Sequence, residues 1–271
     1  MHFTLTYERA PTDPASGPVT VGWLRETERA GVLYAPPERV HTRPPNKAHA
    51  KSAARCPAVR NMESRFFQIR CPFDLHLGFD RDAQGRPVLV NRMGRESPVR
   101  SAKLGEILVM VPEDEWRHPD RPTLQLKLPY IFVADEPVWL TQLDAFAHYR
   151  RDPLPGTIFG GRFPIDRWPR GIVWALEWHD TARDLILHRG EPLFYLLFEV
   201  DHPDRALQLV EAERTDELTR YIEHISGAVS YVDQTFALFR QAEAARPARL
   251  LTPRPRDCPA RARSASGSDR M

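Results

Sequence analysis

The apolar residues in the central part of the chain occur in short runs that proline, glycine and charged residues interrupt. Many runs are rich in β-branched, leucine and aromatic side chains, which is typical of β-strands. The predicted strands are residues 66–69, 73–79, 88–91, 104–111, 124–133, 138–143, 171–178, 185–188, 193–200 and 207–210. Strands at this spacing predict an all-β domain over residues 61–213, either a jelly roll or a β-sandwich.

After residue 213 the apolar positions follow a helical period instead. These positions are Leu218, Ile222, Ile225, Val229, Val232, Phe236 and Phe239. They predict one long C-terminal amphipathic helix over 214–245, which begins at Thr215 as a cap, with Asp216 and Glu217 in its first turn. The apolar stripe of this helix either packs on the sheet of the same chain or forms a homodimer with a second copy.

The remaining segments differ from both in composition. Residues 1–34 hold two strand-like runs, 3–7 and 19–24, around a turn-rich stretch, and they predict an N-terminal β-hairpin. Residues 35–60 are rich in proline and cations and poor in large apolar side chains, which predicts an exposed connecting arm outside the core. Residues 246–271 hold seven arginines against two aspartates and predict a disordered basic tail.

The charge of the whole chain is nearly balanced, with 38 lysines and arginines against 36 aspartates and glutamates. It lacks the uniformly basic character of a dedicated nucleic-acid binder, so nucleic acid is not an expected partner. No apolar run approaches the roughly 20 residues of a membrane-spanning helix, so no membrane partner is expected. The N-terminal segment lacks the basic and apolar parts of a secretory leader, which predicts a cytoplasmic location.

The three cysteines have no paired spacing of the kind that indicates a zinc site or a disulfide framework, so reduced thiols are expected. Cys71 lies in an apolar run and is expected to be buried and inert. Cys56 lies in a cationic stretch, where nearby positive charge favours a reactive thiolate; the alternative is that it only turns the chain before Pro57.

The strands at 171–178 and 185–188 suggest a hairpin with metal-binding potential. Side chains alternate along a strand, so Glu177 and His179 share one face, and His188 on the second strand is expected to join them. Two histidines and one carboxylate are the ligand set of mononuclear non-haem iron oxygenases, which implies Fe(II) as the cofactor. The alternative is that the three residues lie on the solvated face of the hairpin. Asp74 and His76 form a reserve pair with the same spacing.

The Pro/Gly-rich stretch 149–171 is predicted to be a long loop that carries arginines beside aromatic residues. Arg162, Arg167 and Arg170 are the candidate ligand-binding residues, because guanidinium groups bind carboxylates and phosphates in a bidentate manner. They predict a small-molecule ligand that bears a carboxylate or a phosphate. The alternative is that these arginines only solvate the loop.

Two sets of residues resemble known families. Cys56-Pro57-Ala58, Phe66 to Arg70, Pro72-Phe73-Asp74, Arg189 to Phe194 and Phe198 resemble a family of bacterial and tailed-phage proteins, over roughly residues 55–200. This resemblance implies an all-β domain and no particular activity. The run from Pro164 to Glu191 is similar to the last strands of deoxyuridine triphosphatases and deoxycytidine triphosphate deaminases, which implies a β-clip fold as the alternative. Those enzymes have an Arg-Ser-Ser phosphate motif, whereas here Arg100-Ser101 is followed by Ala102.

Three functional hypotheses follow. The first is a metal-dependent enzyme, a non-haem iron oxygenase that acts on a carboxylate-bearing metabolite. The second is a noncatalytic β-domain that binds a ligand or a partner protein, and the third is a nucleotide-binding β-clip protein. The chain has no phosphate-binding glycine loop and no nucleophile-elbow motif, which argues against P-loop phosphoryl transfer, Rossmann redox chemistry and serine hydrolysis.

Overall fold

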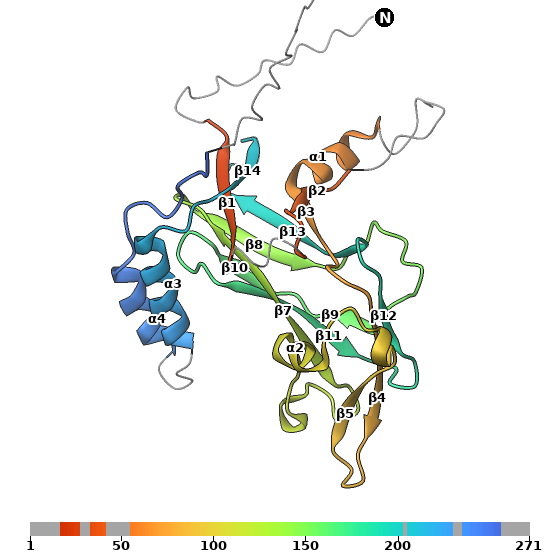
Figure 1. The fold of residues 1–271 in the computed structure, drawn as a ribbon. Helices are drawn as coiled ribbons and strands as arrows, with labels where there is room; N and C mark the ends of the chain where they lie inside the picture. The colour runs from red at the N-terminus through yellow and green to blue at the C-terminus, as the bar shows by residue number, and fades with distance from the viewer. Residues whose placement is uncertain (1–16, 28–32, 42–54, 203–204, 230–234, 256–271) are drawn as a thin grey trace, which may run out of the picture.

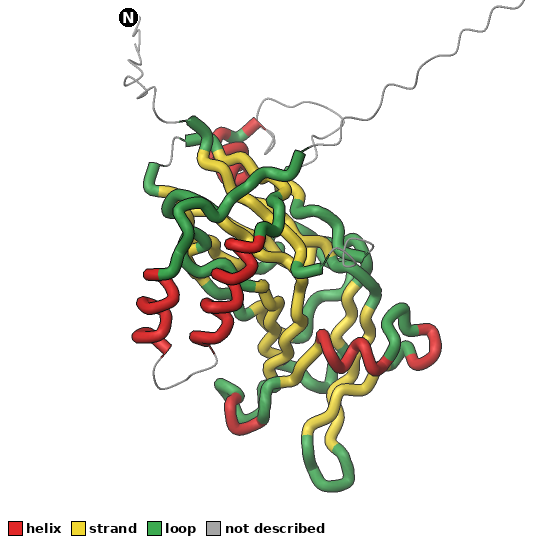
Figure 2. The backbone as a smooth tube through the Cα atoms, turned by 60° about the vertical axis from the view of Figure 1, so that its left-hand side comes forward, coloured by secondary structure: helices red, strands yellow, loops and turns green. Residues whose placement is uncertain are grey.

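A computed structural model describes residues 17–27, 33–41, 55–202, 205–229 and 235–255. Within these residues the chain is mostly β-structure, with short helices at the periphery (Figures 1 and 2). This confirms the all-β expectation. The strand expected over residues 3–7 lies outside the described residues. No described helix has the length and apolar character needed to cross a membrane.

The largest sheet is built around one long strand, β7 (Thr123–Val133). Along one side β7 pairs with β11, and on the other side it pairs with β1 near its C-terminal end and with β6 near its N-terminal end. β14 and β9 form the outer strands. The bounds of these partners are β1 Val19–Arg25, β6 Leu108–Met110, β9 Gly156–Ile158, β11 Gly171–Trp178 and β14 Leu207–Glu211.

Two further sheets complete the β-structure. A five-stranded sheet has the order β10-β8-β13-β3-β2, and a three-stranded sheet has the order β12-β4-β5. Figure 1 shows that β4 and β5 form a hairpin that projects from the rest of the molecule. The bounds are β2 Glu38–Arg39, β3 Phe66–Arg70, β4 Leu75–Arg81, β5 Pro87–Asn91, β8 Val138–Leu143, β10 Arg162–Pro164, β12 Leu185–Leu187 and β13 Pro192–Val200.

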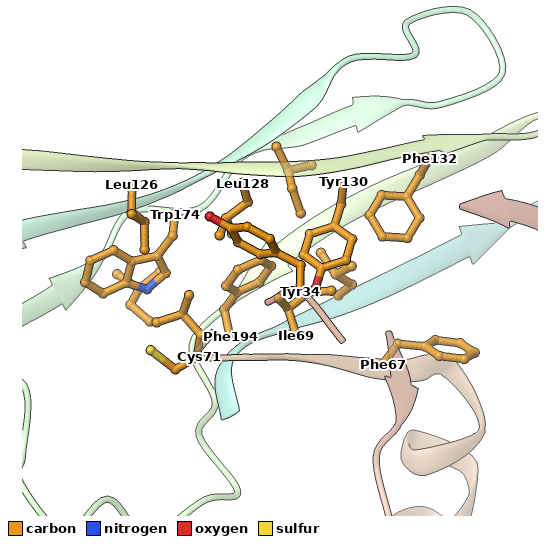
Figure 3. Close-up of a cluster of buried hydrophobic side chains, with 14 of the residues drawn as sticks. Tyr34, Phe67, Ile69, Cys71, Leu126, Leu128, Tyr130, Phe132, Trp174 and Phe194 are labelled. Carbon is orange, nitrogen blue, oxygen red and sulfur yellow. The ribbon is translucent and has the colours of Figure 1, made fainter. Parts of the chain in front are cut away.

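One main hydrophobic core draws residues from all three sheets. Alternate residues of β7, such as Leu126, Tyr130 and Phe132, point into it and meet Phe194 of β13 (Figure 3). Tyr34, from the chain after β1, lies between these two layers and contacts the ring of Tyr130 edge-on, with the ring centroids 6.1 Å apart. The alternating pattern in the sequence is therefore the pattern of core-facing side chains.

Most strand predictions are confirmed, and two of them, 138–143 and 171–178, match to the residue. The strand predicted over 104–111 is wrong for its first half, which belongs to helix α2 (Ser101–Ile107) before β6 begins. The stretch 149–171 is not a plain loop, because it holds β9 and β10. Helix α1 (Pro57–Arg65), with proline in its first turn, was not anticipated.

The first two predicted segments are not separate units. β1 lies inside the main sheet, parallel to β14 and antiparallel to β7, instead of forming an N-terminal hairpin domain. The connecting arm is likewise not wholly outside the core, because β2 pairs with β3 and Val40 is buried against Ala145 and Tyr195. In both cases the strand that pairs with the segment comes from a distant part of the sequence.

The C-terminal helical region is two helices, α3 (Asp216–Val229) and α4 (Thr235–Ala244), which lie beside one another in both views (Figures 1 and 2). The prediction of one long helix is therefore wrong. Its predicted start is confirmed, since the hydroxyl of Thr215 accepts a hydrogen bond from the Leu218 N–H at 3.2 Å. The stripe of α3 packs on Leu24 and Ile131 of the main sheet. This stripe of α3 is thus covered within the chain, and the homodimer stays a prediction.

The chain continues to pack on the sheet after α4. Leu250 and Leu251 are buried, and both of their N–H groups donate to Oδ1 of Asp135, at 2.6 and 3.0 Å. Pro253 forms a bridge with Ala212 beyond the end of β14. The expected disordered tail is therefore wrong for residues 246–255, while 256–271 lie outside the described residues.

Candidate functional site

The predicted metal ligands Glu177 and His179 lie together at the end of β11. His179 Nε2 is 3.1 Å from Glu177 Oε1, and the guanidinium groups of Arg117 and Arg121 lie 3.6 and 3.7 Å from the same carboxylate. Glu177 is itself buried. The carboxylate is therefore surrounded by basic groups that compensate its charge, which is the arrangement of an ion-pair cluster.

His188 does not join them, because the predicted hairpin does not form. β11 pairs with β7 on one side and with β9 on the other, so no edge is left for β12, which pairs with β4 instead. His188 Nε2 then lies 2.6 Å from Asp152 Oδ2, and its Nδ1 lies 3.9 Å from Asp74 Oδ1. The structure thus separates His188 from the Glu177–His179 pair.

The reserve pair is separated in a similar way. His76 Nε2 lies 2.7 Å from Asp184 Oδ2, while Asp74 accepts a hydrogen bond from the Arg189 N–H at 2.9 Å. Within the described residues, no group of three or more His, Cys, Asp or Glu side chains could hold a metal ion. The predicted Fe(II) site has no geometric support in this part of the chain.

The predicted ligand-binding arginines have three different surroundings. Arg162 Nε lies 2.9 Å from Glu199 Oε2, and its guanidinium stacks over Trp139 at 4.1 Å. Arg167 Nε lies 3.5 Å from Asp166 Oδ2. Arg170 has no carboxylate partner among the described residues; it stacks over Trp168 at 5.1 Å and donates to the backbone carbonyl of Gly171 at 3.3 Å. Only Arg170 is therefore placed to meet an external anion.

Arg170 lines a cavity of about 750 Å³ beside β7 and β11. The cavity is also bordered by α2, by α3 and by the chain on either side of residues 28–32. Its apolar lining comes from Leu33, Tyr34, Phe73, Val99, Ile107, Leu128, Ile172 and Ile225. This volume lies within the range of small-molecule sites in proteins.

An irregularity in the strand pairing lies at this cavity. Gly171 of β11 pairs with Ile131 of β7, but Val173 pairs with Lys127, so three residues of β7 oppose the single residue Ile172. One of the three is Pro129, which has no N–H to donate to the sheet. Bulges of this kind bend a strand pair and redirect its side chains, and they recur beside functional sites. The bulge therefore lies next to Arg170, which directly precedes β11.

The charge of the cavity wall is mainly positive. Lys103 of α2, Lys127 of β7 and Arg170 line it, against one carboxylate, Glu26. Lys103 is 2.6 Å from Glu106 on its own helix, whereas Lys127 has no ion-pair partner in the described ranges. Burial lowers the pKa of Arg170, because removal from water disfavours its charged form. An anion in the cavity would compensate that penalty.

The titratable groups of the wall are few. Among the described residues that line it, Glu26 is the only carboxylate, and there is no histidine or cysteine. Lys103 and Lys127 were not predicted from the sequence, because each lies in an unremarkable amphipathic context and only the fold places them in the same lining as Arg170.

The two motifs that carried the resemblance to bacterial and phage proteins meet in space. Gly190 N–H donates to the Cys71 carbonyl at 2.9 Å, and Cys71 N–H donates to the Glu191 carbonyl at 2.8 Å. Gly190 has a φ of 84°, a left-handed conformation that favours glycine. No protein-family model matches the chain, and no curated protein matches it either. That resemblance therefore stays a prediction, and function has to be argued from the geometry of the site.

Proposed function

We propose that the protein is a noncatalytic β-domain whose cavity at β7 and β11 binds a small molecule with an apolar body and an anionic head, either a carboxylate or a phosphate. The observation that carries this proposal is the combination of an apolar wall with Lys127 and Arg170, two cations that have no carboxylate partner among the described residues. The proposal keeps the anionic ligand that the sequence suggested and assigns it mainly to Arg170.

The apolar wall supplies the affinity and the cations supply the selectivity. The lining includes Leu33, which is 49% exposed, beside the almost fully buried Phe73, Leu128 and Ile172, so a ligand chain placed in the cavity covers apolar surface and leaves water. Each methylene group that leaves water contributes about 0.8 kcal/mol, which is roughly a fourfold gain in affinity. The head group then meets a half-buried guanidinium, with which a carboxylate forms strong, charge-assisted hydrogen bonds.

A metal-dependent oxygenase is not proposed, because His179 and His188 contact different carboxylates, those of Glu177 and Asp152. The nucleotide-binding hypothesis remains open only as one member of the phosphate-bearing class. Nucleotides therefore belong in the panel of ligands tested, beside simple amphipathic carboxylates.

A thermal-shift panel tests the proposal, since a ligand that binds the native state raises the unfolding midpoint. Octanoate and dodecanoate should raise it in order of chain length, while acetate and octanol at equal concentration should raise it much less. In Arg170→Gln the shift by octanoate should fall to that of octanol, the uncharged alcohol of the same chain length. Arg167→Gln is the matched control, because it removes an equal charge from the same loop but not from the cavity wall.

Two results would contradict the proposal. One is an equal response to carboxylates and alcohols, which would leave the cations without a role. The other is an equal loss of the response in Arg167→Gln and Arg170→Gln, which would show a general charge effect and not binding at this cavity.

A further inference from the structure

A second cavity, of about 280 Å³, lies where α1 meets β2 and the start of β14. Three arginines line it, Arg39, Arg65 and Arg205, together with Asn61, Ser64 and the chain at 206–207. No carboxylate from the described part of the chain belongs to this lining. None of these residues lines the larger cavity, so the two sites are independent.

Arg39 is fixed in this cavity by uncharged groups. Its guanidinium stacks over the ring of Phe67 at 4.8 Å and donates to the backbone carbonyls of Ser64 and Leu207, the latter at 2.8 Å. It has no ion-pair partner among the described residues. Its orientation is therefore set before any ligand arrives, and its charge is not compensated by a described carboxylate. Preorganised guanidinium groups lose little freedom on binding.

Arg65 and Asn61 are brought to the same cavity by helical spacing. They are four residues apart on α1, so they lie on one face of that helix. The nearby charge of Arg65 adds to burial in lowering the pKa of Arg39, which shows that the two guanidinium groups act on each other. Arg205 contributes a third guanidinium, already paired with Glu136 outside the lining.

We propose that this cavity binds a small oxyanion, a phosphate or a phosphate monoester. Arg39 and Arg65 both line the cavity, guanidinium groups bind the oxygens of such an anion through charge-assisted hydrogen bonds, and the amide of Asn61 adds a neutral donor. The volume lies just below the range of drug-sized sites and suits a phosphoryl group with a small substituent. This site extends the function of the protein beyond the larger cavity.

Isothermal titration with inorganic phosphate, at constant ionic strength set with chloride, tests this site on the full chain. We expect saturable binding that weakens by about tenfold or more in Arg65→Gln, which removes one guanidinium. Arg60→Gln is the matched control, since it removes an equal charge from the same helix but not from the cavity lining, and it should bind as the wild type does.

Further variants keep the test decisive if Arg65→Gln folds poorly. Arg39→Lys keeps the charge but loses the planar fork, and it should also weaken binding, whereas Arg170→Gln should not. Methyl phosphate distinguishes the two ligand sources: binding as tight as that of inorganic phosphate assigns a monoester, and clearly weaker binding assigns free phosphate. Both results support the site.

The proposal is overturned if phosphate gives no saturable heat with the wild type, or if Arg65→Gln and Arg39→Lys bind it undiminished. A single-stranded oligonucleotide that binds much more tightly than methyl phosphate, and loses that binding in the same variants, would also overturn it. The site would then serve the backbone of a polymer and not a small anion.

Discussion

The residue Gly22 of β1 offers a quantitative test of how the C-terminal segment packs. A Cβ atom at this position would overlap Leu251 Cδ1 and come within 2.9 Å of Val133 Cγ2 and 3.0 Å of Ala212 Cβ. The substitution Gly22→Ala should therefore crowd the contact between β1 and residues 246–255. Overpacking costs about 1–3 kcal/mol, and the loss of glycine freedom in the unfolded chain offsets about 0.4–1 kcal/mol of this.

The partner substitution acts through the same contact. Leu251 is 6% exposed, so Leu251→Ala should lower the free energy of unfolding by about 2–3 kcal/mol, near the low end for buried leucines, because the site lies at the periphery. In the double variant the alanine methyl at position 22 occupies space that Leu251 Cδ1 has left. The free energy of unfolding lost in the double variant should then be smaller than the sum of the two single losses, by about 1 kcal/mol or more.

Urea denaturation of the four proteins, followed by circular dichroism, gives the coupling energy. Gly105→Ala is the control, because a Cβ atom at Gly105 in α2 has no neighbour within 4 Å. Gly105→Ala should stabilise the protein by up to about 1 kcal/mol. When it is combined with Leu251→Ala, the two changes in the free energy of unfolding should simply add. Losses for Gly22→Ala and Leu251→Ala that add within about 0.5 kcal/mol would refute the packing of residues 246–255 on β1.

Two other predictions rest on single side chains. Burial raises the pKa of the Cys71 thiol to about 12, so iodoacetamide at neutral pH should modify Cys71 only after the protein is unfolded. Peptide mass mapping of the native and the unfolded protein measures this. Modification of Cys71 in the native protein at the rate of the exposed Cys56 would contradict the prediction. Hydrogen bonding from Arg162 lowers the pKa of Glu199 below its ordinary 4.5, so the pair stabilises the fold above that value and loses this contribution as the pH falls through the lower folded pKa. The difference in unfolding free energy between wild type and Arg162→Gln should therefore shrink as the pH is lowered from neutrality to below 4.5, and a difference that grows would contradict the assignment.

The local features of the sequence predicted the strands well but not their partners. The alternation of Trp174, Leu176 and Trp178 defines β11 because these side chains all face the core. The run from Leu104 to Leu108 was wrongly predicted to be part of a strand, because its apolar positions fit either a buried strand or the inner face of a short helix. The jelly roll or β-sandwich inferred from strand spacing stays a prediction.

The sites depended on pairings between distant residues, which is where local patterns fail. The predicted metal site assumed that β12 pairs with the strand just before it, whereas its partner β4 lies about a hundred residues earlier. The ligand-binding role proposed for Arg170 was also predicted from its place in an arginine-rich stretch, and it stays a prediction. Its separation from Arg162 and Arg167 was not, since that depends on which carboxylate each arginine meets in the fold.

The central claim is that the cavity at β7 and β11 holds the apolar body of an anionic ligand, with its head at Arg170. A crystal structure of the protein grown with dodecanoate, at a concentration that saturates the thermal shift, tests this most directly. We expect the alkyl chain against Leu128 and Ile172, with the carboxylate within hydrogen-bonding distance of the Arg170 guanidinium. An empty cavity, or a ligand bound elsewhere while Arg170 faces only protein, would contradict the account.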